Sequence, residues 1–158
     1  GCHFIDTMSF LAKSDLESVS SMALNSEKAL VIKNDNVILN LRFKDGSIGT
    51  LSYLTNGNKS FPKEQMSLFC EGKVFELDNY KKVNAYGSSG MKKWSQDKGH
   101  KDEMIGFVES IKSSKENLIS LESLVNTTLA TFAHVRSLEE NRIVQISELE
   151  DELNELIK

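Results

Sequence analysis

The first six residues of this 158-residue chain, Gly1 to Asp6, carry the side chains best suited to acid–base chemistry. His3 and Asp6 are three residues apart, so a helix would place both on one face. A neutral imidazole titrates near physiological pH and can accept a proton during a reaction. Asp6 would either orient that imidazole or tie the helix start to a nearby loop. A histidine at a helix start is also commonly a capping or surface group, so these two residues alone leave catalysis open.

Two further segments carry polar side chains that suit the recognition of hydroxyl groups. Asn58 and Lys59 lie in an Asn- and Gly-rich loop, and Lys98 and His100 precede a predicted helix. Amide and ammonium groups can bind polyol oxygens, and the start of a helix offers backbone donors to anionic or hydroxyl-rich ligands. The alternatives are a turn-forming loop with a solvated lysine and simple helix capping. Both alternatives remain open at this stage.

Several classes of chemistry lack their sequence signals in this chain. It has no Gly-x-Gly turn for a dinucleotide, no His-Glu-x-x-His and no paired cysteines for a metal. Cys2 and Cys70 are too few for a disulfide framework or a structural zinc site. We expect both to be buried free thiols, which favours a reducing, cytoplasmic location.

Length and composition are those of one soluble globular domain. Hydrophobic residues make up 39% of the chain and charged residues 27%, and the net charge is −4. An acidic chain is poorly suited to bind nucleic acid or an anionic membrane. No apolar run approaches the ~20 residues that cross a bilayer. Because the chain does not begin with Met and its first motif has no preceding strand, we expect an upstream part to be missing.

Hydrophobic periodicity predicts the elements of the first third of the chain. A helix is expected over residues 3–13, a strand over 16–24 and a short β-prone piece over 29–33. Residues 36–54 alternate as a hairpin around Asp45-Gly46. A two-residue loop would join Leu39, Leu41 and Phe43 to a face with Ile48, Thr50 and Ser52. A three-residue loop with a left-handed Gly46 would join them to Gly49, Leu51 and Tyr53, and we favour it because that face is more apolar.

The rest of the chain predicts three strands, two helices and a tail. The strands cover residues 66–70, 74–77 and 82–86, with turns at Glu71-Gly72 and Asp78-Asn79. The first helix, with Asp97 as its cap, has an apolar stripe of Met104, Ile105, Val108 and Ile111. The second, capped by Ser120, has a stripe of Leu121, Leu124, Val125, Thr128, Phe132 and Val135. Short turns followed by helices predict an α+β fold, an open, mostly antiparallel sheet with helices on one face.

The last fourteen residues, 145–158, differ in composition and form an acidic amphipathic tail. Ser147 and Glu150 match a capping box, and leucines continue at heptad-like spacing through Leu149, Leu153 and Leu156. Five acidic residues face a single Lys158. The tail would pack on the domain, fray or, less simply, mediate oligomerisation, because two heptads do not establish a coiled coil.

Four segments, in this order along the chain, resemble the C-terminal domain of the Gfo/Idh/MocA oxidoreductases, the glucose–fructose oxidoreductase and inositol dehydrogenase family. They are residues 1–6, 43–50, 56–64 and 96–100. More narrowly, they are similar to a subgroup in which this unit follows a zinc-alcohol-dehydrogenase-like region. The resemblance covers about residues 1–140, and the tail lies outside it.

The resemblance implies a division of labour between two domains. NAD or NADP would bind an N-terminal Rossmann domain that is absent from residues 1–158, so this fragment would bind no cofactor by itself. Hydride would pass between nicotinamide and a sugar or polyol carbon in the cleft between the domains. His3 matches the family's catalytic histidine, which accepts the hydroxyl proton and works with a lysine of the Rossmann domain. The resemblance also makes Asn58, Lys59, Lys98 and His100 the candidate substrate-binding residues.

We therefore expect residues 1–144 to be the substrate-binding and dimerisation domain of an NAD(P)-dependent oxidoreductase, inactive alone. The resemblance also implies a role in polysaccharide biosynthesis and a homo-oligomer that forms through the sheet face. We expect no nucleic-acid or membrane partner and no metal. The alternative is a non-catalytic protein–protein association module, in which the acidic tail and the sheet face with Ile38, Arg42, Ile48 and Thr50 would bind a partner. A Gly-x-Gly-x-x-Gly segment in the upstream gene would favour the enzyme.

Overall fold

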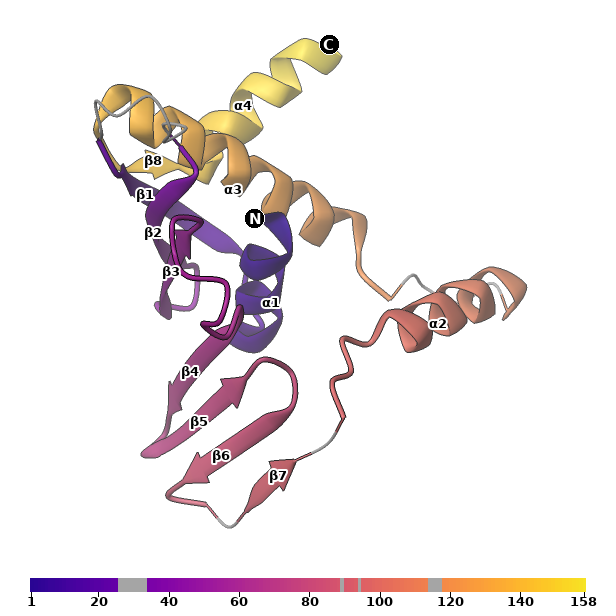
Figure 1. Ribbon diagram of the computed structural model, residues 1–158. Helices are drawn as coiled ribbons and strands as arrows, with labels where there is room; N and C mark the ends of the chain where they lie inside the picture. Colours follow the sequence, from indigo (N-terminus) through magenta and orange to yellow (C-terminus); the bar gives the residue numbers. More distant parts are fainter. Residues whose placement is uncertain (26–33, 89, 94, 114–117) are drawn as a thin grey trace. The chain divides into compact units, whose positions relative to one another are not determined.

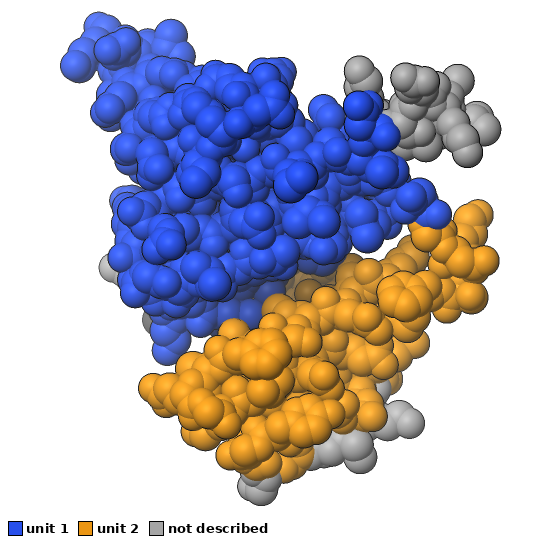
Figure 2. Space-filling model, turned by 90° about the vertical axis from the view of Figure 1, so that its left-hand side faces the viewer, with its two compact units in different colours: residues 1–56, 119–158 blue, residues 57–118 orange. Residues whose placement is uncertain are grey.

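The computed structural model describes residues 1–25, 34–88, 90–93, 95–113 and 118–158. The chain forms two compact units (Figure 2), residues 1–56 with 119–158 and residues 57–118. Each unit has its own four-stranded antiparallel sheet, so two open sheets replace the single sheet expected from the sequence. The α+β class is confirmed. The β-prone piece predicted at residues 29–33 lies outside the described residues.

The first unit has a sheet in the order β3-β2-β1-β8 with helices on one face (Figure 1). Its strands are β1 Leu16–Ala23, β2 Asn36–Phe43, β3 Ile48–Leu54 and β8 Val144–Gln145, and its helices are α1 Cys2–Ala12, α3 Leu121–Glu140 and α4 Ile146–Ile157. The short strand β8 was not predicted. It pairs with β1 and therefore fixes the entry of α4 at the edge of the sheet.

The hydrophobic core fills the space between this sheet and the three helices. Alternate residues of β2 point into it: Val37, Leu39, Leu41 and Phe43 are all buried. Each helix contributes to the same core, for example Ile5 from α1, Ala130 from α3 and Leu149 from α4. The two-residue period of β2 thus confirms the predicted strand with one buried face.

The turn between β2 and β3 is the three-residue bulged turn that the sequence favours. Phe43 donates its N–H to the carbonyl of Ser47 at 3.0 Å, and Gly46 donates to the carbonyl of Phe43 at 3.0 Å. Gly46 has a φ of 90°, a conformation that costs glycine little and other residues much. Leu41 consequently lies opposite Gly49, which gives the sheet its apolar inner face.

Helix α1 lies close to the sheet because Gly49 has no side chain. A Cβ at Gly49 would lie 3.0 Å from the sulfur of Met8, which is tighter than most such contacts, so the Met8 side chain would have to shift. The helix ends at Lys13, whose φ of 53° is left-handed. The predicted helix is confirmed with bounds one residue earlier at each end.

The predicted buried face of α3 is wrong, although the helix and its Ser120 cap are confirmed. Ser120 accepts a hydrogen bond from the N–H of Ser123 at 3.1 Å. Of the six predicted stripe residues, only Val125 packs against the core; Leu121, Leu124, Thr128, Phe132 and Val135 are exposed. The helix instead buries the opposite side, with Asn126, Leu129, Ala130, Ala133 and Ser137. Small residues on this side allow the helix to lie close to the sheet.

Two polar residues explain why this side of α3 faces inward. Asn126 accepts the N–H of Leu16 at 2.8 Å and donates to the carbonyl of Leu16 at 3.2 Å. Ser137 accepts the N–H of Ser21 at 2.9 Å. Buried backbone groups of β1 are satisfied in this way, and leaving such groups unpaired costs about 1–3 kcal/mol each. Hydrophobic spacing alone cannot show this requirement.

The second unit contains a meander and one helix. The strands β4 Gln65–Cys70, β5 Lys73–Asp78, β6 Lys82–Tyr86 and β7 Met91–Lys93 form a sheet in that order, and α2 covers His100–Ser113. The three predicted strands are confirmed, and β7 was not predicted. The turn after β5 has left-handed residues at Asn79 and Tyr80, one position later than predicted.

Apolar residues of this second unit remain largely uncovered. Ser110 is the only buried residue among those described here. The predicted stripe of α2 is exposed along its length: Met104, Ile105, Val108 and Ile111. Asp97 accepts the N–H of Gly99 at 2.9 Å, before the helix begins, so it is not the predicted cap. Cys70, like Cys2 in the first unit, is exposed, and the expectation of two buried thiols is wrong.

Helix α4 begins earlier than the predicted capping box. The reciprocal hydrogen bonds of that motif join Gln145 and Glu148, two residues before the predicted Ser147 and Glu150. Pairing of β8 with β1 sets this start, a long-range contact that the local sequence does not reveal. Within the part of the chain that the structure describes, no helix has the length and apolar content to span a bilayer.

Candidate functional site

His3 lies in the first turn of α1 with its side chain exposed. Its ring centroid is 4.0 Å from that of Phe4, at a tilt of 42°. Phe4 in turn contacts Tyr53 of β3 edge-on, with 6.3 Å between centroids. The backbone carbonyl of His3 accepts a hydrogen bond from the hydroxyl of Thr7 at 2.7 Å. The imidazole therefore lies beside the aromatic pair Phe4 and Tyr53, and the hydrogen bond from Thr7 fixes the backbone of His3.

Asp6 does not orient the imidazole in this structure. Among the described residues, neither the His3 ring nor the Asp6 carboxylate takes part in a hydrogen bond or an ion pair. Asp6 is half-buried on α1, close to the sheet side of the helix. Both nitrogens of His3 thus remain available to a ligand, which suits a proton acceptor that meets its substrate from solvent.

In the second unit, Asn58 shapes its own loop. The Oδ1 atom of Asn58 accepts hydrogen bonds from the N–H and the hydroxyl of Ser60, both at 2.9 Å. The carbonyl of Asn58 accepts the N–H of Phe61 at 3.0 Å. These contacts form a tight turn and leave the amide NH₂ group as the free donor of Asn58. Lys59, at the tip of the loop, is exposed.

Lys98 is brought to the end of this same loop by an ion pair. Its Nζ atom lies 2.7 Å from Oε2 and 2.9 Å from Oε1 of Glu64, whose side chain is only 17% exposed. The contact to Oε1 has the geometry of a hydrogen bond, and the one to Oε2 is electrostatic. The ammonium group is also 5.6 Å from the ring centroid of Tyr80. Lys98 therefore has a structural role here, which leaves it less free to bind a ligand.

His100 is the first residue of α2 and is exposed. It follows Gly99, whose N–H is already used by Asp97. The structure thus joins Lys98 to the segment that follows Asn58 and Lys59, and it shows no side-chain contact for His100 among the described residues. This helix start consequently offers an accessible but isolated imidazole.

His134, by contrast, is a packing residue. Its Nδ1 atom lies 2.8 Å from the hydroxyl of Ser21 on β1. Burial is the largest cause that lowers the pKa of His134 below its usual value. The imidazole is therefore held neutral between α3 and the sheet.

A feature that sequence reasoning did not single out is a shallow hollow on the outer face of the first sheet. It has a volume of about 270 Å³ and is lined by residues including Ser18, Ser20, Asn40, Arg42 and Thr50. The hydroxyl of Thr50 donates to Oδ1 of Asn40 at 3.0 Å. Strand alternation places these side chains opposite the core, so the hollow is a property of the uncovered face.

The described residues do not fit a dinucleotide or a metal ion. Their strands pair only in the antiparallel sense, whereas the dinucleotide turn joins a parallel strand to a helix. No Gly-x-Gly turn precedes α2. Within the described ranges, no three His, Cys, Asp or Glu side chains cluster as metal ligands would.

No known protein-family model matches this chain, and no related sequence was found among curated proteins. The fold, however, is shared with solved oxidoreductases. An oxidoreductase from Agrobacterium radiobacter in complex with NAD+, L-tartaric acid and magnesium matches with a TM-score of 0.75 and 16% identity, over 94% of this chain and 48% of that one. UDP-N-acetylglucosamine 3-dehydrogenase from Acidithiobacillus ferrooxidans matches with a TM-score of 0.71 and 13% identity, over 88% and 47%.

An aldose–aldose oxidoreductase from Caulobacter crescentus, complexed with glycerol, matches with a TM-score of 0.71 and 14% identity, over 92% and 45% of the two chains. At these identities the likeness establishes a common fold. The chain spans about half the length of the structures that it matches.

Proposed function

We propose that this chain is the substrate-binding part of an NAD(P)-dependent oxidoreductase that acts on a sugar or polyol. The observation that carries the proposal is the fold, which covers nearly all of this chain and about half of each matched oxidoreductase. Two of those enzymes are named for sugar substrates, and one was solved with NAD+. The four sequence segments that resemble the Gfo/Idh/MocA family support the same assignment independently.

His3 would accept the proton of the substrate hydroxyl in this proposal. Oxidation of a carbinol to a carbonyl removes a hydride from carbon and a proton from oxygen, and the proton needs a base near neutral pH. The exposed imidazole of His3 has no competing partner among the described residues. In the second unit, Asn58 and Lys59 would offer amide and ammonium donors to hydroxyl groups of a sugar or polyol.

The nicotinamide nucleotide would be held by a part of the protein other than residues 1–158. The described residues lack the glycine-rich turn and the parallel strands that such a nucleotide needs. The chemistry left to this chain is to hold the sugar or polyol and to receive its proton. We therefore expect residues 1–158 alone to be inactive.

The outer face of the first sheet would associate with a second copy of the protein. Exposed apolar side chains lie on that face, with Met22 74% and Ile48 78% exposed. Ile48 also lines the hollow that contains Arg42. The same observation favours the alternative function, an association module in which His3 has no chemical role. A role in polysaccharide biosynthesis and fusion to a zinc-alcohol-dehydrogenase-like region are finer parts of the proposal, which rest on the sequence resemblance. A cytoplasmic location rests on the low number of cysteines.

Kinetics of the complete protein test this function. The protein expressed from the complete reading frame should reduce NAD+ or NADP+ with at least one member of a panel of sugars, nucleotide sugars and polyols. His3→Asn should lower kcat by about 10²–10⁴-fold, the usual contribution of a general base, and should remove the loss of rate on the acid side of the pH profile. Nucleotide affinity should be unchanged.

His134→Gln is the matched control, because it replaces the packing histidine and should keep the pH profile. The enzyme assignment is wrong if the complete protein binds no nicotinamide nucleotide. If it is active but His3→Asn retains the wild-type rate and pH profile, the role of His3 is wrong while the function stands.

A further inference from the structure

The apolar ridge of α4 begins in the core and ends in solvent. Ile146 and Leu149 are 2% and 6% exposed, whereas Leu156 and Ile157 are 85% and 74% exposed. Leu153, between them, is half-buried. Helical spacing places all five on one side of α4. The last turns of the helix therefore continue a core-forming face beyond the residues that cover it.

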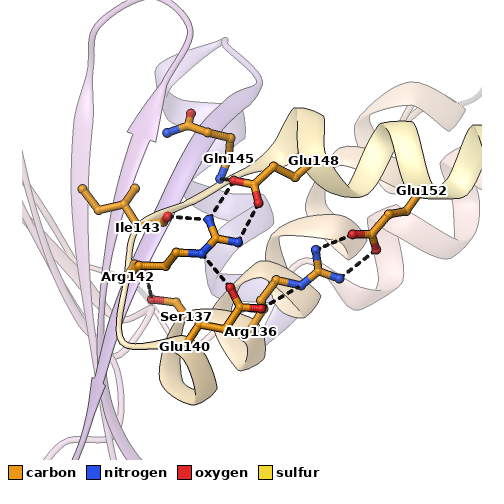
Figure 3. A network of polar contacts seen from close by, with 8 residues as sticks. All are labelled: Arg136, Ser137, Glu140, Arg142, Ile143, Gln145, Glu148 and Glu152. Atoms are coloured by element: carbon orange, nitrogen blue, oxygen red, sulfur yellow. Dashed lines mark hydrogen bonds and ion pairs between the residues drawn. The ribbon is translucent and has the colours of Figure 1, made fainter.

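Two arginines fix the base of this helix (Figure 3). Arg142 binds both carboxylate oxygens of Glu148, at 2.9 and 2.7 Å, and Arg136 binds both oxygens of Glu152, at 2.6 and 2.7 Å. Paired hydrogen bonds of this kind fix orientation as well as distance. Together with the capping box at Gln145, they hold the first turns of α4 on the first unit. The exposed end is thus presented on an ordered base.

The charges of α4 are mostly acidic, and one unpaired carboxylate, that of Glu150, lies beside the ridge. Glu148 and Glu152 are occupied by the arginines, but Glu150, Asp151 and Glu155 have no ion pair or side-chain hydrogen bond among the described residues. The last turn carries no basic residue, and Lys158 at the C-cap is the single basic residue of the tail. Glu150 lies three residues before Leu153, beside the ridge, whereas Asp151 lies on the opposite side of the helix.

We propose that the exposed end of the α4 ridge, formed by Leu153, Leu156 and Ile157, is a docking site for another protein. The docking segment of that protein would be a helix with an apolar side flanked by Lys or Arg. An apolar ridge supplies the contact area of helix-on-helix recognition, and the carboxylate of Glu150 beside it favours a basic partner. A second copy of α4 fits less well, because pairing would bring two acidic helices together. An anionic membrane is disfavoured for the same reason. The proposal does not depend on the enzyme function.

A labelled synthetic peptide tests the site, with the complete protein as receptor. The probe is an amphipathic helical peptide composed only of leucine and lysine. Fluorescence anisotropy measures the Kd of this peptide for the complete protein. Leu156→Ser with Ile157→Ser should weaken binding at least about tenfold, since two apolar side chains would lose their burial. These residues are exposed, so the variant should fold, and its circular dichroism should match that of the wild type.

Two single-charge variants form the matched pair. Glu150→Gln should weaken peptide binding by several fold and reduce its salt dependence, whereas Asp151→Asn, with the same change of net charge, should have less than about twofold effect. A peptide with glutamate in place of lysine should not bind. Equal Kd values for wild type and Leu156→Ser/Ile157→Ser, or equal effects of the two charge variants, would overturn the proposal. The proposal would also be overturned if the wild type formed a concentration-dependent dimer that Leu156→Ser/Ile157→Ser abolishes. Binding of the wild type to phosphatidylserine vesicles that the double variant abolishes would overturn it as well.

Discussion

Single polar residues decide how the first unit packs. Asn126 and Ser137 satisfy backbone groups of β1, and His134 contacts Ser21 on the same strand. The apolar stripe of α3 would place each of these polar residues on the solvent side of the helix. Buried polar groups need partners, so the side of α3 that carries these residues turns inward. The two candidate residues His3 and Lys98 also differ in their contacts. Lys98 is paired with Glu64, whereas the His3 ring has no hydrogen bond or ion pair among the described residues.

The neutral imidazole of His134 should make the stability of the protein depend on pH. Its pKa is lowered in the folded state, mainly by burial, so on acidification the unfolded chain binds its proton first. Stability is therefore fully retained above the unfolded pKa of about 6.5 and is lost as the pH falls below it. Urea unfolding at about pH 8 and about pH 5.5 should show a larger loss for the wild type than for His134→Gln. Equal losses would mean that His134 does not titrate in this range.

In helices α3 and α4, the burial seen in the structure differs from the burial that the local apolar pattern predicts. The apolar stripe of α3 around Phe132 and Val135 is exposed, and the side with Ala130 and Ala133 is buried. In α4 the first turns follow the apolar pattern into the core, and the last turns, with Leu156, do not. The arginine pairs on Glu148 and Glu152 set where α4 leaves the unit (Figure 3).

Removing the Arg142 side chain should loosen α4 and change its response to acid. The hydrogen bond from Arg142 is the largest cause that lowers the pKa of Glu148 to about 2. Because an ordinary glutamate has a pKa near 4.5, this contribution is present above about pH 4.5 and is lost as the pH falls towards 2. Thermal unfolding at about pH 7 and about pH 3 should show a smaller difference for Arg142→Gln than for the wild type. Lys101→Gln, at an exposed basic residue without an ion pair in the described residues, is the control and should behave as the wild type.

Over the whole molecule, the two sheets differ in how well they are covered. The first has a packed core on one face and an open outer face, and the second unit buries almost nothing among its described residues. Protein surfaces that expose this much apolar area commonly contact other domains or chains. This observation supports the proposed oligomer and a chain that works as part of a larger assembly.

A charge on the outer face of the first sheet should disrupt the proposed oligomer. Ile48→Glu in the complete protein should shift sedimentation velocity profiles to the monomer, because association would bury the new carboxylate. Phe10→Glu is the matched control on α1, since Phe10 is 77% exposed and Ile48 is 78% exposed. An oligomer that persists in Ile48→Glu, or is lost equally in Phe10→Glu, would place the interface elsewhere.

The sequence by itself determined the elements whose signals are local. The alternation of β2, the left-handed Gly46 of its bulged turn and the Ser120 cap all follow from steric and hydrogen-bonding preferences within a few residues, and the structure confirms them. The α+β class follows from the order of these elements. The candidate residues His3, Asn58, Lys59, Lys98 and His100 came from spacing and family resemblance, and their roles stay predictions.

Only the tertiary structure decided which faces are buried and which polar groups are occupied. Leu16 lies 110 residues before Asn126, so no local pattern could show that α3 must turn its amide towards β1. Lys98 pairs with Glu64 across 34 residues, and β8 pairs with β1 at the other end of the chain. Such contacts depend on the path of the chain in space, because satisfying a distant backbone group or carboxylate outweighs the local hydrophobic pattern.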